Sequence, residues 1–227
     1  MATQDIKGKN LVYDTRSAVL EMLESRGYNI DSYKSFTKDE IILQFKQSNT
    51  KFLQSGEISP LDILVKNDKN QKIFVKYRLD FKFKKSKSLD QQIDTIFSDI
   101  IDKDDTLIII YVSRILSIHK DSNVYQYSEN IFNKKQFFVQ FFGLENFLFN
   151  PTKNNIVPKH IIVDQNEEDE LLQRYNIDNK NKLLIIVRED PIAKYIGLKP
   201  GQICRIEANS YSSMNTVKYR LCVNSQN

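Results

Sequence analysis

Apolar residues recur at helical spacing in three parts of the first half of the chain. Across residues 10–27 they return every three or four positions, which predicts an amphipathic helix. A second helix is expected to begin at Thr37, because Thr37 and Glu40 form the pattern of a capping box. A third is expected from Ser88, with a regular apolar stripe over residues 89–100.

Strand-like patterns separate and follow these helices. Residues 72–83 alternate in part and end in lysines, which is typical of a strand that leaves a sheet. Residues 106–113 form a short, apolar, β-branched run, as in a strand buried on both faces, and residues 134–142 predict another strand. Helices that alternate with strands indicate an α/β domain over residues 1–142.

The second half of the chain carries shorter elements. Two strands are expected at residues 160–164 and 182–187. Between them, residues 166–175 predict a helix, and Asp164 with Glu167 repeats the capping-box pattern at its start.

The stretch DPIAKYIGLKPGQICRI contains signals for both ends of a short helix and for a tight turn. Asp190 is a helix N-cap, and Pro191 suits the first helical position because its missing N–H would be unpaired there. Gly197 is a typical helix stop, and Pro200 with Gly201 predicts a type II turn. We interpret the role of these Pro and Gly residues as structural: they set where the helix begins and ends and where the chain turns.

Two further strands, at residues 202–208 and 216–223, are predicted to form a hairpin with a long polar loop. Together these elements indicate an α+β module with a small mixed sheet and short helices over residues 143–227.

Composition narrows the class of protein. Hydrophobic residues make up 41% and aromatic residues 11% of the 227 residues, as in a globular protein. No stretch approaches the roughly eighteen apolar residues of a membrane span, and the N-terminal segment MATQDIKGKN lacks the apolar core of a signal peptide. Cys204 and Cys222 fit an intracellular chain with free thiols. We therefore expect an intracellular protein without a membrane partner.

Charge is distributed unevenly around the net value of +4. Residues 66–87 contain nine Lys or Arg against two Asp, and residues 89–105 then contain six Asp against one Lys. A basic run of this kind either attracts a phosphate backbone or lies on a solvated strand edge, where lysines discourage unwanted pairing. Both interpretations stay open at this point.

Several segments of the second half resemble one known family. They are IVPKH at 156–160, ELLQRY at 170–175, DPIAKYIGLKPGQICRI at 190–206 and VKYR at 217–220. In this order and spacing they are similar to the small subunit shared by eukaryotic RNA polymerases I, II and III, which has a counterpart in the archaeal RNA polymerase. The segment VLEMLESRGYNI resembles the first helix of that family more weakly.

The chain also departs from the family pattern. It has LLIIV at 183–187 where the family has a proline and a polar strand, and its hairpin loop differs as well. Abundant Asn, Lys and Ile fit an AT-rich genome. The resemblance is therefore to a divergent version of the subunit, or to one encoded by a large DNA virus.

The resemblance implies a non-catalytic subunit of a DNA-directed RNA polymerase. Its N-terminal domain would be a restriction-endonuclease-like part of the lower jaw beside downstream DNA, and its C-terminal module would dock on the largest subunit. Such a protein works in the nucleus if it is cellular, and in the virion, viral factory or cytoplasm if it is viral. The candidate interface residues are Pro158, His160, Pro191, Tyr195, Leu198, Tyr219 and Arg220. For Tyr195 and Leu198 a place in the module's own core is an open alternative.

The candidate DNA-proximal residues come from the basic run, through which we expect weak, sequence-independent attraction to phosphates. They are Lys76, Arg78, Lys82, Lys84, Lys85 and Lys87.

The alternative hypothesis is a metal-dependent nuclease or a stand-alone DNA-binding protein. Pro60–Asp62 and Asp80–Lys82 resemble the two halves of a restriction-type motif, in which carboxylates hold Mg²⁺ and a lysine polarises the attacked phosphate. Both halves are short, so we expect no catalytic residue. His119 and His160 lack neighbouring ligands at zinc spacing. We therefore predict no metal, no cofactor and no small-molecule substrate.

Overall fold

The computed structural model describes residues 2–51, 58–78, 87–111, 122–208 and 216–224. The chain divides into two units, Met1–Phe149 and Asn150–Asn227, whereas the sequence analysis placed the boundary after residue 142. The difference arises because a short 3₁₀ helix, η1 (Leu144–Phe147), follows the last strand of the N-terminal unit, and its Leu144 and Phe147 are buried. Each unit is described separately.

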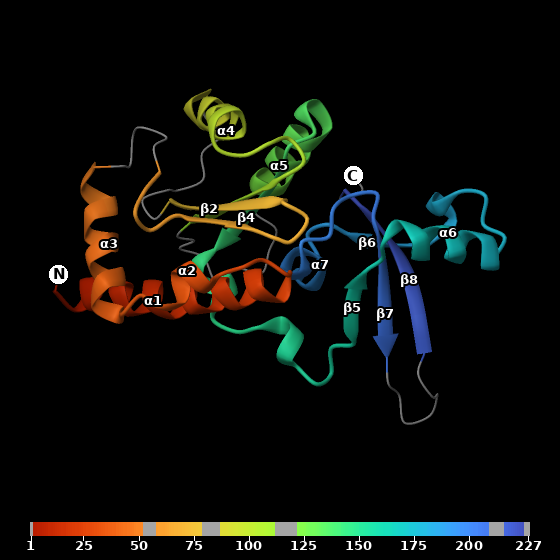
Figure 1. The fold of residues 1–227 in the computed structure, drawn as a ribbon, viewed down its shortest axis with the longest axis horizontal. Coiled ribbons are helices and arrows are strands. Elements are labelled where there is room, and N and C mark those ends of the chain that lie inside the picture. The colour runs from red at the N-terminus through yellow and green to blue at the C-terminus, as the bar shows by residue number, and fades with distance from the viewer. Residues whose placement is uncertain (1, 52–57, 79–86, 112–121, 209–215, 225–227) are drawn as a thin grey trace. The chain divides into compact units, whose positions relative to one another are not determined.

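The N-terminal unit is built on a four-stranded sheet in the order β1-β2-β3-β4. β1 pairs with β2 in the antiparallel sense, and β2, β3 and β4 are parallel to their neighbours. Figure 1 shows α4 and α5 on one face of this sheet and α1 on the other. The strands are β1 (Ile63–Lys66), β2 (Lys72–Arg78), β3 (Thr106–Tyr111) and β4 (Phe138–Gly143).

The helices of this unit are α1 (Ala2–Ser25), α2 (Asp31–Lys34), α3 (Lys38–Lys51), α4 (Lys87–Asp99) and α5 (Ser122–Lys135). The predicted capping box before α3 is confirmed, because the Thr37 N–H donates to Glu40 Oε2 at 2.7 Å and the Glu40 N–H donates to Thr37 Oγ1 at 3.4 Å. β1 and α5 were not predicted from the sequence pattern.

The aromatic residue just before β4 packs against α4: the Phe137 ring stacks on Phe97 with 4.0 Å between the ring centroids.

The main core of the N-terminal unit lies between the sheet and the helices α4 and α5. All six residues of β3 are buried, which confirms the prediction of a strand covered on both faces. The apolar stripe predicted over residues 89–100 faces this core, with Leu89, Ile93, Ile96 and Phe97 buried. These observations support an α/β architecture, and the likeness to a restriction endonuclease stays a prediction.

The C-terminal unit is built on a second four-stranded sheet in the order β5-β7-β8-β6. β7 is antiparallel to both β5 and β8, and β6 is parallel to β8, so the sheet is mixed as predicted. Its strands are β5 (Lys159–Ile162), β6 (Leu184–Val187), β7 (Ile203–Ala208) and β8 (Thr216–Val223). Its helices are α6 (Gln165–Arg174), α7 (Pro191–Ile196) and the 3₁₀ turns η2 (Pro151–Lys153) and η3 (Lys180–Lys182).

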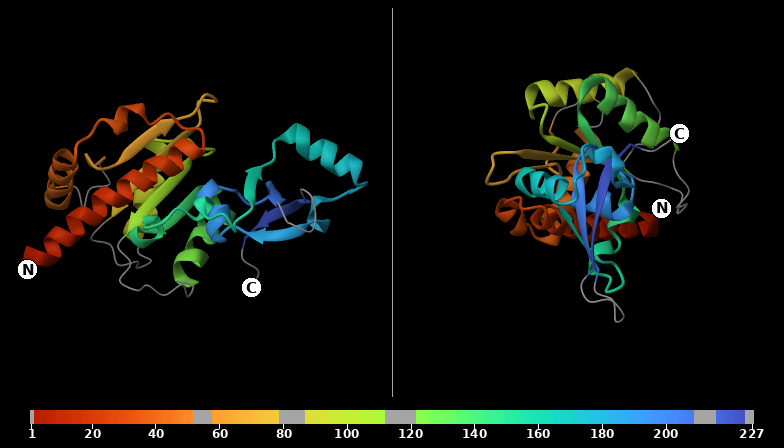
Figure 2. Two further views of the ribbon diagram at one scale, coloured as in Figure 1. Left: turned by 90° about the horizontal axis from the view of Figure 1, so that it is seen from below. Right: turned by 90° about the vertical axis from the view of Figure 1, so that its right-hand side faces the viewer.

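The two faces of this sheet carry separate small cores. Ala193 and Leu198, within and just after α7, pack with Cys204, Ile206 and Cys222 on one face. On the other face, α6 contributes Leu171 to a cluster with Val163, Ile203 and Leu221, and Figure 2 shows α6 along that side of the strands. No helix among the described residues combines the length and apolar character that a bilayer crossing requires.

Candidate interaction surface

The segment around α7 is held in one conformation by its own side chains. Asp190 Oδ1 accepts hydrogen bonds from the Ile192 and Ala193 N–H groups at 2.9 and 3.2 Å, so the predicted N-cap is confirmed. Pro191 occupies the first helical position. The helix ends at Gly197, whose φ of 78° lies in the left-handed region that favours glycine.

The predicted turn after α7 ties this segment to the hairpin. The Gln202 N–H donates to the Lys199 carbonyl at 3.1 Å, and Gly201 has a φ of 88°, as the second central position of a type II turn requires. The Gly201 N–H donates to the Cys222 carbonyl, and the Cys222 N–H donates to the Gln202 carbonyl, both at 2.8 Å. The position of α7 is therefore fixed by β8.

Two of the candidate interface residues belong to the interior. Leu198 is 0% exposed and packs in the core cluster of the α7 face, and Tyr195 is 6% exposed. Their apolar character therefore serves packing, and the prediction that these two side chains anchor a partner is corrected. Pro191 is exposed, and Pro158 and His160 are half-buried.

The remaining candidates lie on opposite faces of the sheet. His160 pairs in register with Ile206, and Cys204 with Arg220, so His160 and Arg220 share the face that α7 covers in part. Tyr219, next to Arg220 along β8, points to the α6 face. His160 and Arg220 are therefore accessible from one side of the sheet and Tyr219 from the other.

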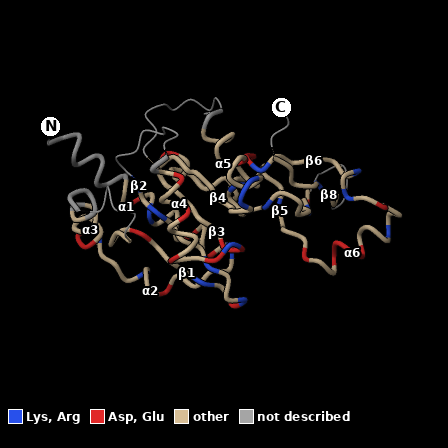
Figure 3. The backbone as a smooth tube through the Cα atoms, turned by 90° about the horizontal axis from the view of Figure 1, so that it is seen from above, with Lys and Arg blue, Asp and Glu red and all other residues tan. Residues whose placement is uncertain are grey.

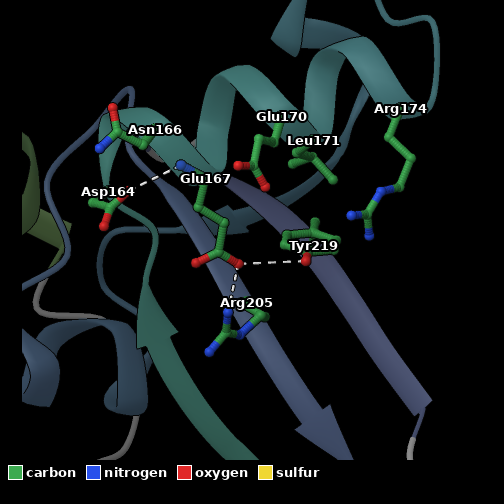
Figure 4. Close-up of a pocket in the computed structure, with 8 residues that line it drawn as sticks. All are labelled: Asp164, Asn166, Glu167, Glu170, Leu171, Arg174, Arg205 and Tyr219. Atoms are coloured by element: carbon green, nitrogen blue, oxygen red, sulfur yellow. Dashed lines mark hydrogen bonds and ion pairs between the residues drawn. The ribbon is translucent and has the colours of Figure 1, made fainter.

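On the α6 face the structure forms a polar cleft of about 440 Å³. Glu167 lies at its centre and accepts hydrogen bonds from Arg205 Nη1 at 2.6 Å and from the Tyr219 hydroxyl at 3.4 Å (Figure 4). Asp164 Oδ1 accepts the Glu167 N–H at 2.9 Å, as a capping residue does. Only half of the second predicted capping box forms, because the Glu167 carboxylate of α6 is bonded to Arg205 of β7.

The cleft has mixed charge with acidic excess on its helical wall. Asp164, Glu167 and Glu170 line it together with Arg174 and Arg205, and Figure 3 shows several acidic positions along α6. Burial, followed by the charge of Glu167, raises the pKa of Tyr219, so its hydroxyl stays protonated and donates. The hydrogen bond with Glu167 raises the pKa of Arg205.

Two described members of the basic run in the N-terminal unit, Lys76 and Arg78, are not exposed. Lys76 is 4% exposed, and its Nζ lies 3.2 Å from Asp62 Oδ2 inside the unit. The prediction that Lys76 faces DNA is therefore wrong, because this lysine neutralises a buried carboxylate. Arg78 is half-buried and its Nη1 donates to Gln92 Oε1.

The other members of that run fall outside the description or carry no side-chain detail. Lys82, Lys84 and Lys85 lie outside the described residues, and for Lys87 only the backbone, at the start of α4, is described.

The suspected nuclease carboxylate is also fully engaged. Asp62 Oδ1 accepts the Tyr77 N–H at 2.9 Å, and Oδ2 accepts the Ser59 N–H at 2.8 Å and the Lys76 ammonium. Burial raises the pKa of Asp62, although Lys76 and these donors oppose the rise. Asp80 and Lys82 lie outside the described residues. Among the described residues, no group of three or more His, Cys, Asp or Glu is placed to hold a metal ion.

The two cysteines are interior residues of the C-terminal unit. Both pack in the core beside α7, and burial raises the pKa of Cys204 to about 11 and that of Cys222 to about 12. They are therefore neutral thiols near pH 7, without the thiolate that redox chemistry requires.

Comparison with known sequences agrees with this architecture. Residues 149–222, which span nearly the whole C-terminal unit, match the family RNA polymerase Rpb5, C-terminal domain. The C-terminal unit is similar to this domain, and we refer to it below as the Rpb5-like domain. The polar cleft of Figure 4 and the capped helix α7 both belong to this Rpb5-like domain.

Relatives extend the likeness over the N-terminal unit. The chain is 27% identical over 214 residues to a protein of Dictyostelium discoideum named DNA-directed RNA polymerases I, II, and III subunit rpabc1, covering 94% of this chain and 98% of the relative. It is 26% identical over 213 residues to DNA-directed RNA polymerases IV and V subunit 5B of Arabidopsis thaliana, covering 93% and 88%. The predicted relationship to the shared polymerase subunit is confirmed, and with it the prediction of a non-catalytic polymerase subunit. The matches give the nuclease alternative no support.

Two ionic groups in the Rpb5-like domain were not predicted from the sequence. One joins Arg205, Glu167 and Tyr219 across the α6 face. The other joins Glu189 to Lys194 at 3.1 Å and to Arg188 Nε at 3.5 Å. Glu189 and Lys194 lie five positions apart, a spacing without a helical signature, and Arg205 meets Glu167 only after the sheet forms. The only feature of the sequence that pointed to either ionic group was the high proportion of charged residues at 164–174.

Proposed function

We propose that this chain acts as a non-catalytic subunit of a multisubunit DNA-directed RNA polymerase and docks through its Rpb5-like domain on the largest subunit. The family match over residues 149–222 carries the proposal, and relatives aligned over nearly their full length support it. The engagement of Asp62 by Lys76 supports a structural role for the N-terminal unit rather than metal-dependent cleavage.

The face beside α7 is the docking surface that the residues favour. Pro191 is exposed there, and His160 and Arg220 lie on the same face of the sheet. A rigid, capped helix start loses little conformational entropy on binding, which favours an interface.

A pair of matched substitutions tests this surface. Pro191→Glu and Gln165→Glu each place a carboxylate at the first residue of a capped helix, where negative charge suits the helix dipole, so both proteins should fold. The measurement is a tagged pull-down from the native source at moderate salt, followed by mass spectrometry. Pro191→Glu should lower recovery of the largest subunit by about tenfold, and Gln165→Glu should leave it unchanged.

The outcomes separate the two parts of the proposal. If the wild-type protein is recovered without large polymerase subunits, the subunit role fails. If wild type and Pro191→Glu recover them equally, the role holds but the α7 face is not the docking surface.

For the N-terminal unit we propose a place in the lower jaw near downstream DNA, with weak attraction to phosphates. The exposed lysines Lys66 and Lys69 support this role, in place of the buried Lys76. Replacing both by Gln should reduce by roughly two the slope of log affinity for duplex DNA against log salt. An unchanged slope would exclude this contact. We further propose that the protein is intracellular, in the nucleus if it is cellular and in the virion or viral factory if it is viral.

A further inference from the structure

The outer strand β6 of the C-terminal sheet exposes apolar side chains. Leu184 is 68% exposed, and Ile185 and Val187 are each 37% exposed, while Ile186 between them is buried in the core. The strand contains no charged residue. Exposed apolar edge strands are prone to pair with another chain, and proteins usually protect them.

The backbone of β6 has hydrogen-bonding groups directed away from the sheet. The Arg188 N–H donates to the Val223 carbonyl at 2.9 Å, and Val187 pairs in register with Val223. In a parallel ladder the bonded residues alternate, so the N–H groups of Ile185 and Val187 point to the open side. The Ile185 carbonyl accepts Arg220 Nη1 at 3.2 Å, and the Val187 carbonyl accepts the Asp190 N–H. The two outward N–H groups can therefore pair with an added strand.

Two other outer strands, β1 and β5, are protected. In the N-terminal unit, the Tyr33 hydroxyl bonds to both the N–H and the carbonyl of Leu64 in β1, at 3.0 and 3.2 Å, and the Asn29 N–H donates to the Lys66 carbonyl. At the far edge of the C-terminal sheet, α7 packs against β5, and β5 begins with the exposed Lys159. Among the described residues of the C-terminal unit, no side chain bonds to the outward N–H groups of β6, and the strand itself contains no lysine.

The charges beside β6 indicate what kind of strand fits there. Arg220 pairs in register with Leu184, and the exposed Lys218 lies two residues earlier on the same face of β8. Arg220 reaches over β6 and bonds to the outward Ile185 carbonyl, so carboxylates on an added strand would complement its charge and that of the nearby Lys218. A second copy of this chain, paired antiparallel through β6, would instead bring these cations close to their own equivalents, which disfavours that arrangement.

We propose that β6 is a docking edge for an extended segment of another polypeptide in which apolar residues alternate with Asp or Glu. The segment adds a fifth strand beside β6, its carbonyl groups accept the outward N–H groups, and its carboxylates meet Lys218 and Arg220. The pairing edge at β6 is distinct from the helix start at Pro191, although Arg220 belongs to both surfaces, so the proposal goes beyond the proposed function and its test does not depend on it.

The test uses the full chain and synthetic peptides. The probe is a fluorescein-labelled dodecapeptide of alternating Val and Glu, and fluorescence anisotropy measures its affinity at low salt. A Val–Lys peptide tests charge, and a Val–Glu peptide N-methylated at every second residue on its pairing edge tests the backbone bonds. We expect each analogue to bind about tenfold more weakly than the Val–Glu peptide.

Protein variants test the same edge from the other side. Ile185→Pro removes an outward N–H and no bond to β8, and should weaken binding about tenfold. Val187→Lys tests the edge without a backbone change, and Ile156→Lys is its matched control at an exposed position outside the sheet. Lys218→Glu should bind the Val–Glu peptide more weakly and the Val–Lys peptide more tightly.

Each outcome decides the proposal. Weaker binding by Val187→Lys and by the N-methylated peptide, with Ile156→Lys unchanged, supports it even if Ile185→Pro fails to fold. Failure of the wild-type protein to bind the Val–Glu peptide, or equal binding of all peptides, overturns it. A dimer in sedimentation velocity that Val187→Lys dissociates also overturns it, because the edge would then hold a second copy. None of these results depends on recovery of a polymerase.

Discussion

The two sheets of this protein are covered to different extents. In the N-terminal unit every residue of β3 and β4 is buried, and the exposed backbone of β1 is bonded to Tyr33 and Asn29. In the C-terminal unit β6 exposes three of its four side chains, and the core is divided between two small clusters. The side chains of β3 and β4 and the edge of β1 are thus covered by their own chain, whereas β6 of the C-terminal sheet presents surface that another chain can cover.

The two units also differ in how deeply their ion pairs are buried. Lys76 and Asp62 of the N-terminal unit have side chains only 5% and 0% exposed, while Arg205 and Glu167 of the C-terminal unit are each 28% exposed. Inside the first unit an unpaired charge is costly, and at the surface of the second it is screened. The following predictions test this contrast, from the largest expected effect to the smallest.

Removing the buried lysine should give the largest loss. Lys76→Met leaves the Asp62 carboxylate without its cation and should lower the free energy of unfolding by about 3–5 kcal/mol at pH 7. Burial raises the pKa of Asp62 above its unfolded value, so protonation removes the buried charge and the deficit should shrink as the pH falls toward 4. Urea unfolding followed by circular dichroism measures both effects.

The matched control for this variant is Lys72→Met. Lys72 pairs with Asp102 at 2.8 Å, but Asp102 is 80% exposed, so the expected loss is about 0–1 kcal/mol. Equal losses for the two variants would contradict the contrast between buried and exposed pairs.

The same leucine substitution should have unequal effects in the two sheets. Leu107→Ala in β3 removes a side chain that is 0% exposed and should cost about 2–5 kcal/mol. Leu184→Ala in β6 removes one that is 68% exposed and should stay within about 0.5 kcal/mol. Thermal and urea unfolding compare them. A loss above about 2 kcal/mol for Leu184→Ala would show that β6 is already covered in the free protein.

Loss of the α7 cap should have an intermediate effect confined to the C-terminal unit. Asp190→Ala removes the acceptor of the Ile192 and Ala193 N–H groups and should cost about 1 kcal/mol. Asp190→Asn, which keeps an acceptor oxygen, is the control and should retain most of the stability. Amide hydrogen exchange should be faster in residues 190–198 of the Ala variant alone, and an equal increase in the N-terminal sheet would argue against independent units.

The last prediction concerns the reactivity of the two cysteine thiols. It involves the smallest change in stability, but folding should change the rate at which the thiols react by a large factor. Because burial raises the pKa of Cys204 to about 11 and of Cys222 to about 12, the thiolate fraction at pH 8 is roughly a hundredfold or more below that of a free cysteine. Iodoacetamide should label the folded protein far more slowly than protein in urea, as mass spectrometry would show. Rapid labelling of the folded protein would mean that the core beside α7 opens.

Local signals in the sequence determined much of the fold. The capping box of Thr37 and Glu40, the cap at Asp190 and the turn at Gly201 each depend on residues within a few positions, so the sequence states them directly. The buried strand β3 is evident from its β-branched run, because a strand covered on both faces consists mainly of apolar residues. The relationship to the polymerase subunit was also present in the order of the motifs.

Only the tertiary structure decided which side chains reach the surface. Lys76 occurs in a run of lysines, and its burial depends on Asp62, fourteen positions earlier, through the pairing of β1 with β2. Glu167 had the local pattern of a capping residue, but Arg205 lies thirty-eight positions away and provides a stronger, charged partner. From the sequence alone, Tyr195 and Leu198 fitted an interface anchor or a core position equally well, and only packing against the sheet showed that both are buried.

For β6, too, the sequence and the tertiary structure determine different properties. The sequence determined that LLIIV forms a strand, because its residues favour one and turn residues flank it. It could not determine that β6 lies at the edge of the sheet, since strand order depends on long-range pairing with β8 rather than on neighbours along the chain. Local hydrogen bonds and periodicity are encoded within a few residues, whereas burial, ion pairing and edge position are properties of the assembled sheet.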